Sequence, residues 1–242
     1  MSSLKYFSGI EVSRSKQAPF LSQQNYTLDL LAKTSNSTCK LVDTPIKTNH
    51  SLSIYTNQIP MNKEIYQRLM GKLIYLTFTR PDLSYAVNVV SQFMHNSSDQ
   101  DMNVVNHILI YMKSSPGKGI MFSRYGHLDS EGYTNFDFAR SRLDKKSTPK
   151  YVSFVGGNLV NWKSKKQNIV SLYSAKVEYR VLYHPSLKLT WLRILLSELK
   201  VGPKKPLVLF YNNTSTIEIA NNLVQHGQTK ILNFIRTTSR IT

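Results

Sequence analysis

The spacing of apolar residues changes once along this chain of 242 residues, and the change limits the folds open to it. Before about residue 125, apolar residues recur every three or four positions, which is the period of helices that bury one face. Beyond residue 128 they occur in short strand-like runs and then return to the helical spacing. We therefore predict two domains, residues 1–125 and 126–242, and an α/β fold for the second.

The first domain is predicted to be mostly helical. In chain order we expect a strand broken at Gly9 and four helices, over residues 4–12, 23–33, 65–76, 81–94 and 99–112. Either Asp99 or Asp101 is a candidate cap for the last of these helices. Residues 34–62 are rich in Ser, Thr, Asn, Lys and Pro, so we expect a long surface connection there.

The second domain is predicted to start with three consecutive strands. The expected elements are three strands, a long helix, a short strand and a helix, over residues 128–138, 151–156, 158–165, 171–199, 207–211 and 214–222. The pair Gly156-Gly157 predicts a hairpin turn between the second and third strands. Pro185 predicts a bend in the long helix, because an interior proline removes a backbone hydrogen bond.

Charge and cysteine content narrow the classes of function. The chain has 31 Lys and Arg against 14 Asp and Glu, a net charge of +17, which favours a nucleic-acid partner. The single cysteine, Cys39, excludes an internal disulfide and a cysteine-cluster metal site. Because no apolar run has the length of a signal peptide core or a membrane helix, we expect an intracellular location, cytoplasm or nucleus, with no membrane partner. Nothing in the sequence indicates a small-molecule substrate.

Several segments resemble copia-type retrotransposon polyproteins, most closely those of plants. They are Lys5–Val12, Gly71–Asp82, Ser114–Gly119, Gly156–Val160 and Trp162–Gln167. The resemblance implies a ribonuclease H-like mixed sheet with flanking helices, preceded by a mostly helical reverse-transcriptase connection region. The polymerase turn Tyr-x-Asp-Asp of that family is not found in this sequence, so we expect no polymerase activity.

The resemblance also implies a metal site. In the family, ribonuclease H chemistry uses two Mg²⁺ ions held by three Asp and one Glu. Its Tyr-Thr-Asp-x-Asp motif corresponds to residues 133–137, which places Asn135 where the first aspartate stands and keeps Asp137 as a neighbouring acid. Its Ser-Ser-Ala-Glu-Ala-Glu-Tyr-Arg motif corresponds to residues 173–180, where Glu178 is the retained ligand and Lys176 replaces the other glutamate.

Two further ligands of the family motif are altered or not found. The Tyr-Cys-Asp-Asn motif corresponds to residues 210–213, so Asn212 stands where the second aspartate would be. The last residue of the sequence is Thr242, and we expect neither the fifth strand nor the fourth carboxylate of the family before it. The expected result is a truncated domain with an exposed sheet edge. Glu178 is then the only metal ligand kept, and we expect no bound cofactor, in contrast to the Mg²⁺ of intact relatives.

Three functional hypotheses follow. The first is a pseudoenzyme with no ribonuclease H activity. The second is a remnant that binds RNA–DNA hybrid or another nucleic acid through its basic residues, for which the candidates are Lys163, Lys165, Lys166, Arg140 and Arg142. The third is an active metal-dependent ribonuclease H with an unconventional site. Taken without the resemblance, Glu178 is an ordinary exposed helix residue and the basic residues are a solvated surface.

Overall fold

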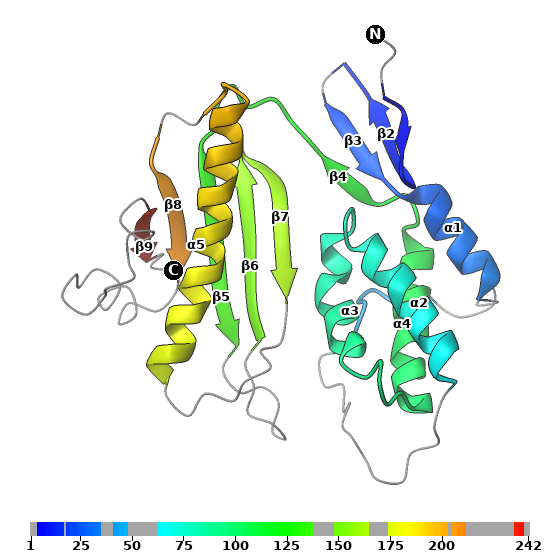
Figure 1. Ribbon diagram of the computed structural model, residues 1–242. Helices are drawn as coiled ribbons and strands as arrows, with labels where there is room; N and C mark the ends of the chain where they lie inside the picture. Colours follow the sequence, from blue (N-terminus) through cyan, green and yellow to red (C-terminus); the bar gives the residue numbers. More distant parts are fainter. Residues whose placement is uncertain are drawn as a thin grey trace. The chain divides into compact units, whose positions relative to one another are not determined.

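The computed structural model describes residues 4–16, 18–34, 41–47, 62–137, 148–164, 174–202, 205–211 and 235–239. Within these ranges, residues 136–137, 148–149, 174–183 and 235–239 are described by their backbone alone. The chain divides into two compact units, Met1–Phe122 and Ser123–Thr242 (Figure 1). The division falls after Phe122, whereas the sequence placed a boundary after residue 125.

The first unit combines a small sheet with a group of helices. Its elements are β1 (Tyr6–Phe7), β2 (Ile10–Arg14), β3 (Pro19–Ser22), α1 (Gln24–Lys33), α2 (Lys63–Leu76), the 3-10 helix η1 (Pro81–Leu83), α3 (Ser84–Ser91), α4 (Asp99–Ser114) and β4 (Gly119–Met121). The strands form an antiparallel sheet in the order β1-β2-β3-β4. The prediction of a mostly helical region is therefore incomplete, because β3 and β4 were not expected.

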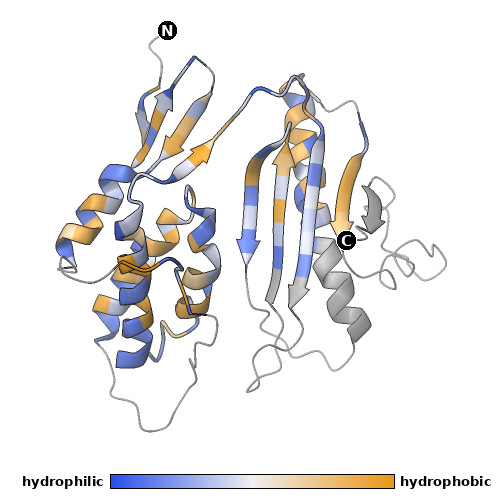
Figure 2. Cartoon of the chain, turned by 180° about the vertical axis from the view of Figure 1, so that it is seen from behind, coloured by the Kyte–Doolittle hydropathy of each residue, from blue (hydrophilic) through white to orange (hydrophobic). Residues whose placement is uncertain are grey.

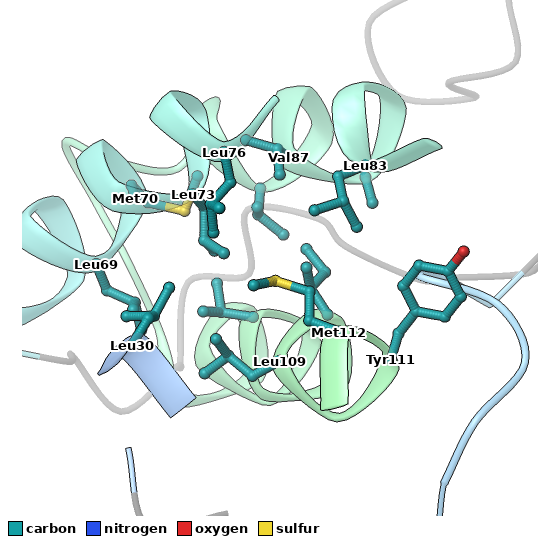
Figure 3. Packing of buried hydrophobic residues seen from close by; sticks show 14 of the residues in the cluster. Leu30, Leu69, Met70, Leu73, Leu76, Leu83, Val87, Leu109, Tyr111 and Met112 are labelled. Carbon is teal, nitrogen blue, oxygen red and sulfur yellow. The ribbon is translucent and has the colours of Figure 1, made fainter. Parts of the chain in front are cut away.

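The helices of the first unit pack around one apolar core (Figure 3). The helices predicted over 65–76, 81–94 and 99–112 are confirmed as α2, η1 with α3, and α4. Their buried residues follow the predicted spacing and include Leu69, Leu73, Leu76, Leu83, Val87, Val90, Val105, Leu109 and Met112. The cap of α4 was predicted wrongly. Ser98 is the N-cap, and Asp101 completes a capping box in which its carboxylate accepts from the Ser98 backbone at 2.8 Å.

Part of the predicted surface connection packs on this core. Residues 41–47 are the described portion of that segment, and Val42 and Ile46 within it lie against the buried cluster. The carbonyl oxygen of Thr44 lies 3.0 Å from the His107 ring nitrogen Nε2 on α4. Two apolar residues in a polar segment are therefore enough to fix it against the helices, which a reading of overall composition does not detect.

The second unit is a mixed five-stranded sheet with one long helix. Its elements are β5 (Ser130–Asp137), β6 (Thr148–Val155), β7 (Asn158–Ser164), α5 (Ser174–Glu198), β8 (Leu207–Tyr211) and β9 (Ile235–Ser239), in the sheet order β7-β6-β5-β8-β9. Neighbouring strands among β5, β6 and β7 are antiparallel, while β8 is parallel to β5 and β9 is parallel to β8. The predicted strands and the long helix, with Pro185 inside it, are confirmed. The helix predicted over 214–222 lies outside the described residues.

The fifth strand is present, so the expectation of a domain that ends before it was wrong. Strand β9 pairs with β8 along its whole length, from Leu207↔Ile235 to Tyr211↔Ser239. Strand pairing uses backbone groups, so the divergent side chains of this segment do not prevent it. The edge of β8 is therefore covered by a further strand.

Helix α5 covers one face of this sheet. A side-chain carbon added at Gly132 on β5 would lie 2.8 Å from a methyl group of Leu189 on α5, so the helix approaches the strand closely there. On the other face, the rings of Tyr133 and Phe210 stack with centroids 4.6 Å apart, and Phe154 meets Tyr133 edge-on. Figure 2 shows β8 as a predominantly apolar strand. Among the described helices of the chain, none combines the length and apolar character needed to cross a bilayer.

Candidate metal centre

Three segments of the second unit meet at one end of the sheet. Strands β5 and β8 run parallel, with Thr134 opposite Tyr211, so their carboxyl ends lie side by side. Helix α5 begins at the same end (Figure 1). The carboxyl ends of parallel strands are a common place for ligand sites in α/β proteins. The fold thus brings the chain around Asn135 and the first turns of α5 to the place where a metal site was expected.

The side chain of Asn135 lies on the face of the sheet away from α5. Successive strand residues point to opposite faces. Thr134 is buried on the α5 side, the side that Gly132 also faces, and its hydroxyl donates to the Lys150 carbonyl oxygen at 3.2 Å. Asn135 therefore shares the face of Tyr133, and it is exposed. An exposed amide at this position provides a carbonyl oxygen but no negative charge.

A lysine that the sequence did not single out stands next to Asn135. In the register of β5 and β6, Asn135 is directly opposite Lys150. Residues opposite each other on antiparallel strands share a face, with Cβ atoms about 4.5–5.5 Å apart. The register therefore places a lysine beside the position where the family resemblance expects a metal-binding carboxylate. Ten residues without described structure separate the two strands, so their register could not be read from the apolar spacing.

The other expected ligands are known only by their place in the chain. Asp137 is the last residue of β5, two positions beyond Asn135, which corresponds to roughly 6.6 Å along a strand. Glu178 lies in α5, one turn after the first residue, Ser174. Asn212 follows the last residue of β8 and lies outside the described residues. The structure brings the backbones of β5 and α5 to one end of the sheet, and it describes no side-chain contact between these positions.

These residues do not fit a pair of magnesium ions. Mg²⁺ prefers anionic oxygen ligands, and a two-metal centre requires several of them. Here the expected ligands are two amides, Asn135 and Asn212, and two acids, Asp137 and Glu178. Lys150 lies opposite Asn135 in the sheet, and Lys176 is two residues before Glu178 in the sequence. A unit charge at 4 Å contributes about 4 kcal/mol at an effective dielectric of 20, and about twice that for a divalent ion. In the part of the chain that the structure describes, no group of three or more His, Cys, Asp or Glu side chains could hold a metal ion.

The predicted basic surface is only partly described. Lys163 on β7 is exposed and stands opposite Tyr151, whereas its neighbour Trp162 stands opposite Val152. Lys163 and Trp162 therefore project from opposite faces and do not form one surface. Strand β7 ends at Ser164, so the predicted strand was one residue too long. Four of the predicted nucleic-acid-binding residues lie outside the described residues: Lys165, Lys166, Arg140 and Arg142.

The first unit contains a buried ion cluster that sequence reasoning missed. The guanidinium of Arg80, with 2% of its side chain exposed, donates to both carboxylate oxygens of Asp82, the shortest contact being 2.9 Å. The same carboxylate accepts from the Tyr111 hydroxyl at 2.9 Å and pairs with Lys118 at 3.3 Å. Arg80 also donates to the Ser115 carbonyl oxygen at 2.9 Å. The cluster fastens the carboxyl end of α4 to η1, which is a structural role.

Comparisons with known proteins find the class of protein that the sequence motifs resemble, the Pol polyproteins of plant transposons. No known family profile matches the chain. It is 38% identical over 227 residues to the retrovirus-related Pol polyprotein from transposon RE2 of Arabidopsis thaliana, covering 94% of this chain and 16% of that protein. It is 29% identical over 224 residues to the Pol polyprotein from transposon TNT 1-94 of Nicotiana tabacum, covering 90% of this chain and 17% of that protein. An uncharacterized mitochondrial protein of Arabidopsis thaliana is 33% identical over 186 residues, 77% of each chain. The chain thus spans about a sixth of the length of these Pol polyproteins.

Proposed function

The chain belongs to the retrovirus-related Pol polyproteins of plant transposons, and from this premise we propose that it is a degenerate copia-type Pol segment without catalytic activity. In this proposal the first unit derives from the reverse-transcriptase connection region. The second unit is a ribonuclease H-like domain.

The strand arrangement supports the fold assignment. Three antiparallel strands come first, a long helix crosses one face, and two parallel strands extend the sheet on the other side of β5. This is the mixed sheet with a flanking helix that the motifs of the second unit lead us to expect. The parallel pair β5 and β8 then provides the edge at which a metal site would be built.

The pairing of Asn135 with Lys150 carries the proposal of lost activity. One strand supplies a neutral amide where an aspartate is expected, and the next strand places a cation opposite it. A divalent ion at this point would lose an attraction and gain a repulsion, each of several kcal/mol at short range. Lys176, in the first turn of α5 and two residues before Glu178, adds a further positive charge at the same end of the sheet. No catalytic step through magnesium follows, because these residues do not fit the ion.

A cleavage assay tests the proposal. The purified full chain is incubated with a labelled RNA–DNA hybrid in Mg²⁺ and, separately, in Mn²⁺, with Glu178→Gln as the matched variant. We expect no cleavage above the level of the Glu178→Gln protein. Metal-dependent cleavage by the unmodified chain that disappears in Glu178→Gln would show an active ribonuclease H and overturn the proposal.

Charge favours a second candidate, a remnant that binds RNA–DNA hybrid without cutting it. The net charge is +17, and Lys163 is exposed on the edge strand β7. Phosphate contacts by lysine and arginine make affinity fall steeply with salt. Hybrid binding measured over a salt series should therefore show a steep slope that becomes shallower by about one unit in Lys163→Ala. A flat salt series would exclude this candidate.

A further inference from the structure

A cavity of about 800 Å³ lies in the second unit, at the amino-terminal ends of β5 and β8. It is lined by the segment that precedes β5, by the turn between β6 and β7, and by residues 200–202 and 205, which lie between α5 and β8. The candidate metal centre lies at the other end of the same strands. Strand β5 runs from Ser130 to Asp137, which at about 3.3 Å per residue separates the two sites by roughly 23 Å.

The walls of the cavity are held in place by specific contacts. The Asn158 side chain accepts from the Ser123 backbone at 2.6 Å and donates to the Ser123 and Gly156 carbonyl oxygens, each at 2.9 Å. Gly156 has a φ of +54°, and a side-chain carbon there would lie 2.3 Å from the His127 carbonyl oxygen. The segment before β5 is thus fixed against the β6–β7 turn. The shape of the cavity therefore depends on glycine at position 156, because a larger residue there would displace the segment around His127.

The cavity carries positive charge that no described residue neutralises. Its one carboxylate, Asp129, is paired with Lys205 at 2.7 Å and lies 3.4 Å from the His127 ring. Arg124 and Lys200 also line the cavity and are exposed. Throughout the described ranges, neither side chain makes a hydrogen bond or an ion pair. Two cations are therefore available to bind an anion.

Lys200 is held in an unusual backbone conformation. Its φ is +58°, in the left-handed region that favours glycine, at the carboxyl end of α5. The amide of Lys200 donates to the Ser197 carbonyl oxygen and that of Val201 to the Leu196 carbonyl oxygen, both at 2.9 Å, which is the Schellman helix end. Glycine would satisfy this backbone better. A lysine at this position therefore costs stability while placing a cation at the cavity.

The remaining wall is apolar and aromatic. Tyr125 packs against Gly157, where a side-chain carbon would lie 2.9 Å from the ring, and 60% of the tyrosine is exposed. Leu128 and Val201 line the same cavity and are also exposed. An aromatic ring beside unpaired cations is the combination that binds nucleotide units, because the base stacks on the ring and the phosphate meets the cations.

We infer that this cavity binds a phosphorylated nucleotide unit, with the phosphate held by Arg124 and Lys200 and the base against Tyr125. The unit can come from two sources, a free nucleotide or one residue of a single strand. No bond is made or broken in this step. The inference does not depend on the metal centre or on the loss of ribonuclease H activity.

The experiment measures binding of a short fluorescein-labelled oligothymidylate to the full chain by anisotropy, in EDTA and over a salt series. Unlabelled thymidine monophosphate is the competitor that separates the two sources. The key variant is Lys200→Gly, which removes the cation and relieves the backbone strain. Arg124→Ala and Tyr125→Ala test the other two contacts. Lys188→Ala is the control, because Lys188 is an exposed lysine on α5, the helix that Lys200 follows, and lies outside the cavity.

We expect Lys200→Gly to weaken binding by roughly threefold to tenfold and to lower the salt slope by about 0.7, the value for one phosphate contact on a single strand. Its melting temperature should rise, which separates a lost contact from a lost fold. Arg124→Ala should act in the same direction, and Lys188→Ala should bind like the unmodified chain. Competition by the monophosphate identifies a free nucleotide as the ligand, and binding that resists it identifies a strand.

Two results would overturn the inference. One is unchanged oligothymidylate binding in Lys200→Gly, Arg124→Ala and Tyr125→Ala. The other is an equal loss in Lys188→Ala, which would mean that diffuse positive charge and not the cavity binds the strand. Because the assay is run without divalent metal, neither result bears on the cleavage assay, and cleavage of a hybrid would not bear on the cavity.

Discussion

Removing the carboxylate of Asp82 is expected to destabilise the first unit strongly. In Asp82→Ala the Arg80 guanidinium, with 2% of its side chain exposed, loses its hydrogen bonds to both carboxylate oxygens and keeps its hydrogen bonds to Ser115. Tyr111 and Lys118 lose the same acceptor. Breaking a buried ion pair by removing one partner costs about 3–5 kcal/mol, because the remaining charge stays buried. Asp82 is 20% exposed, so we take the lower end, about 3 kcal/mol.

The corresponding shift in melting temperature is large. One kcal/mol shifts the midpoint by about 4–8 °C in domains of 60–100 residues and by about 2–4 °C in domains of 150–250 residues. The first unit, Met1–Phe122, lies between these sizes. A loss of about 3 kcal/mol should therefore lower its midpoint by roughly 10 °C or more.

The effect should depend on pH in a defined direction. Burial alone would raise the pKa of Asp82, but hydrogen bonds from Arg80 and Tyr111 and the charges of Arg80 and Lys118 outweigh it and lower the pKa. A lowered carboxylate pKa contributes stability above the ordinary value of about 4, and this contribution is lost as the pH falls through the lowered value. The difference in stability between the unmodified chain and Asp82→Ala should therefore be full at neutral pH and shrink in acid.

The two units can be observed separately. Both tryptophans, Trp162 and Trp191, lie in the second unit, so their fluorescence does not report directly on the first. Hydrogen exchange of peptides from α4, read by mass spectrometry, reports on the first unit. The control is Asp29→Asn, an exposed position on α1. An Asp82→Ala protein whose α4 exchanges as slowly as in the Asp29→Asn control would refute the reasoning that the cluster holds α4 in place.

Two further substitutions test local features of the fold. Ser98→Ala removes the N-cap of α4 and should cost about 1 kcal/mol, seen as faster exchange in its first turn; an unchanged rate would mean that the capping box contributes nothing. Gly156→Ala should lower the tryptophan-fluorescence midpoint of the second unit by more than Gly126→Ala does. Both glycines have a positive φ, but only Gly156 has a carbonyl oxygen 2.3 Å from the new carbon, so equal midpoints would contradict the close approach.

Periodicity predicted the elements that bury one face. Leu73 and Leu109 lie on helical stripes, and residues 207–211 form a short apolar run, so β8 and helices α2, α3 and α4 could be placed from sequence. The short strands could not. Strand β4 has three residues, and its pairing of Phe20 with Met121 joins positions far apart in the chain, which local spacing does not encode.

The sequence predicted which residues form the candidate site, but it did not predict which other residues lie next to them. Motif resemblance selected Asn135 and Glu178, but the partner Lys150 depends on the register of β5 against β6. Strand β9 was missed for a similar reason. Its residues, Ile235–Ser239, lack a clear apolar alternation, and its position follows from backbone pairing with β8. The ion cluster around Arg80 likewise joins residues from three separate segments, which no local pattern reveals.

We propose that lost negative charge at the end of the sheet prevents metal binding. The most direct test is a Mn²⁺ titration followed by electron paramagnetic resonance, on the unmodified chain and on Asn135→Asp with Asn212→Asp. The control carries the same change in charge at two exposed positions of the first unit, Asn96→Asp with Asn103→Asp.

We predict weak Mn²⁺ binding to the unmodified chain and to the control, and binding at least about tenfold tighter in the restored variant, which corresponds to only 1.4 kcal/mol. Tight binding of two Mn²⁺ ions by the unmodified chain would contradict the account.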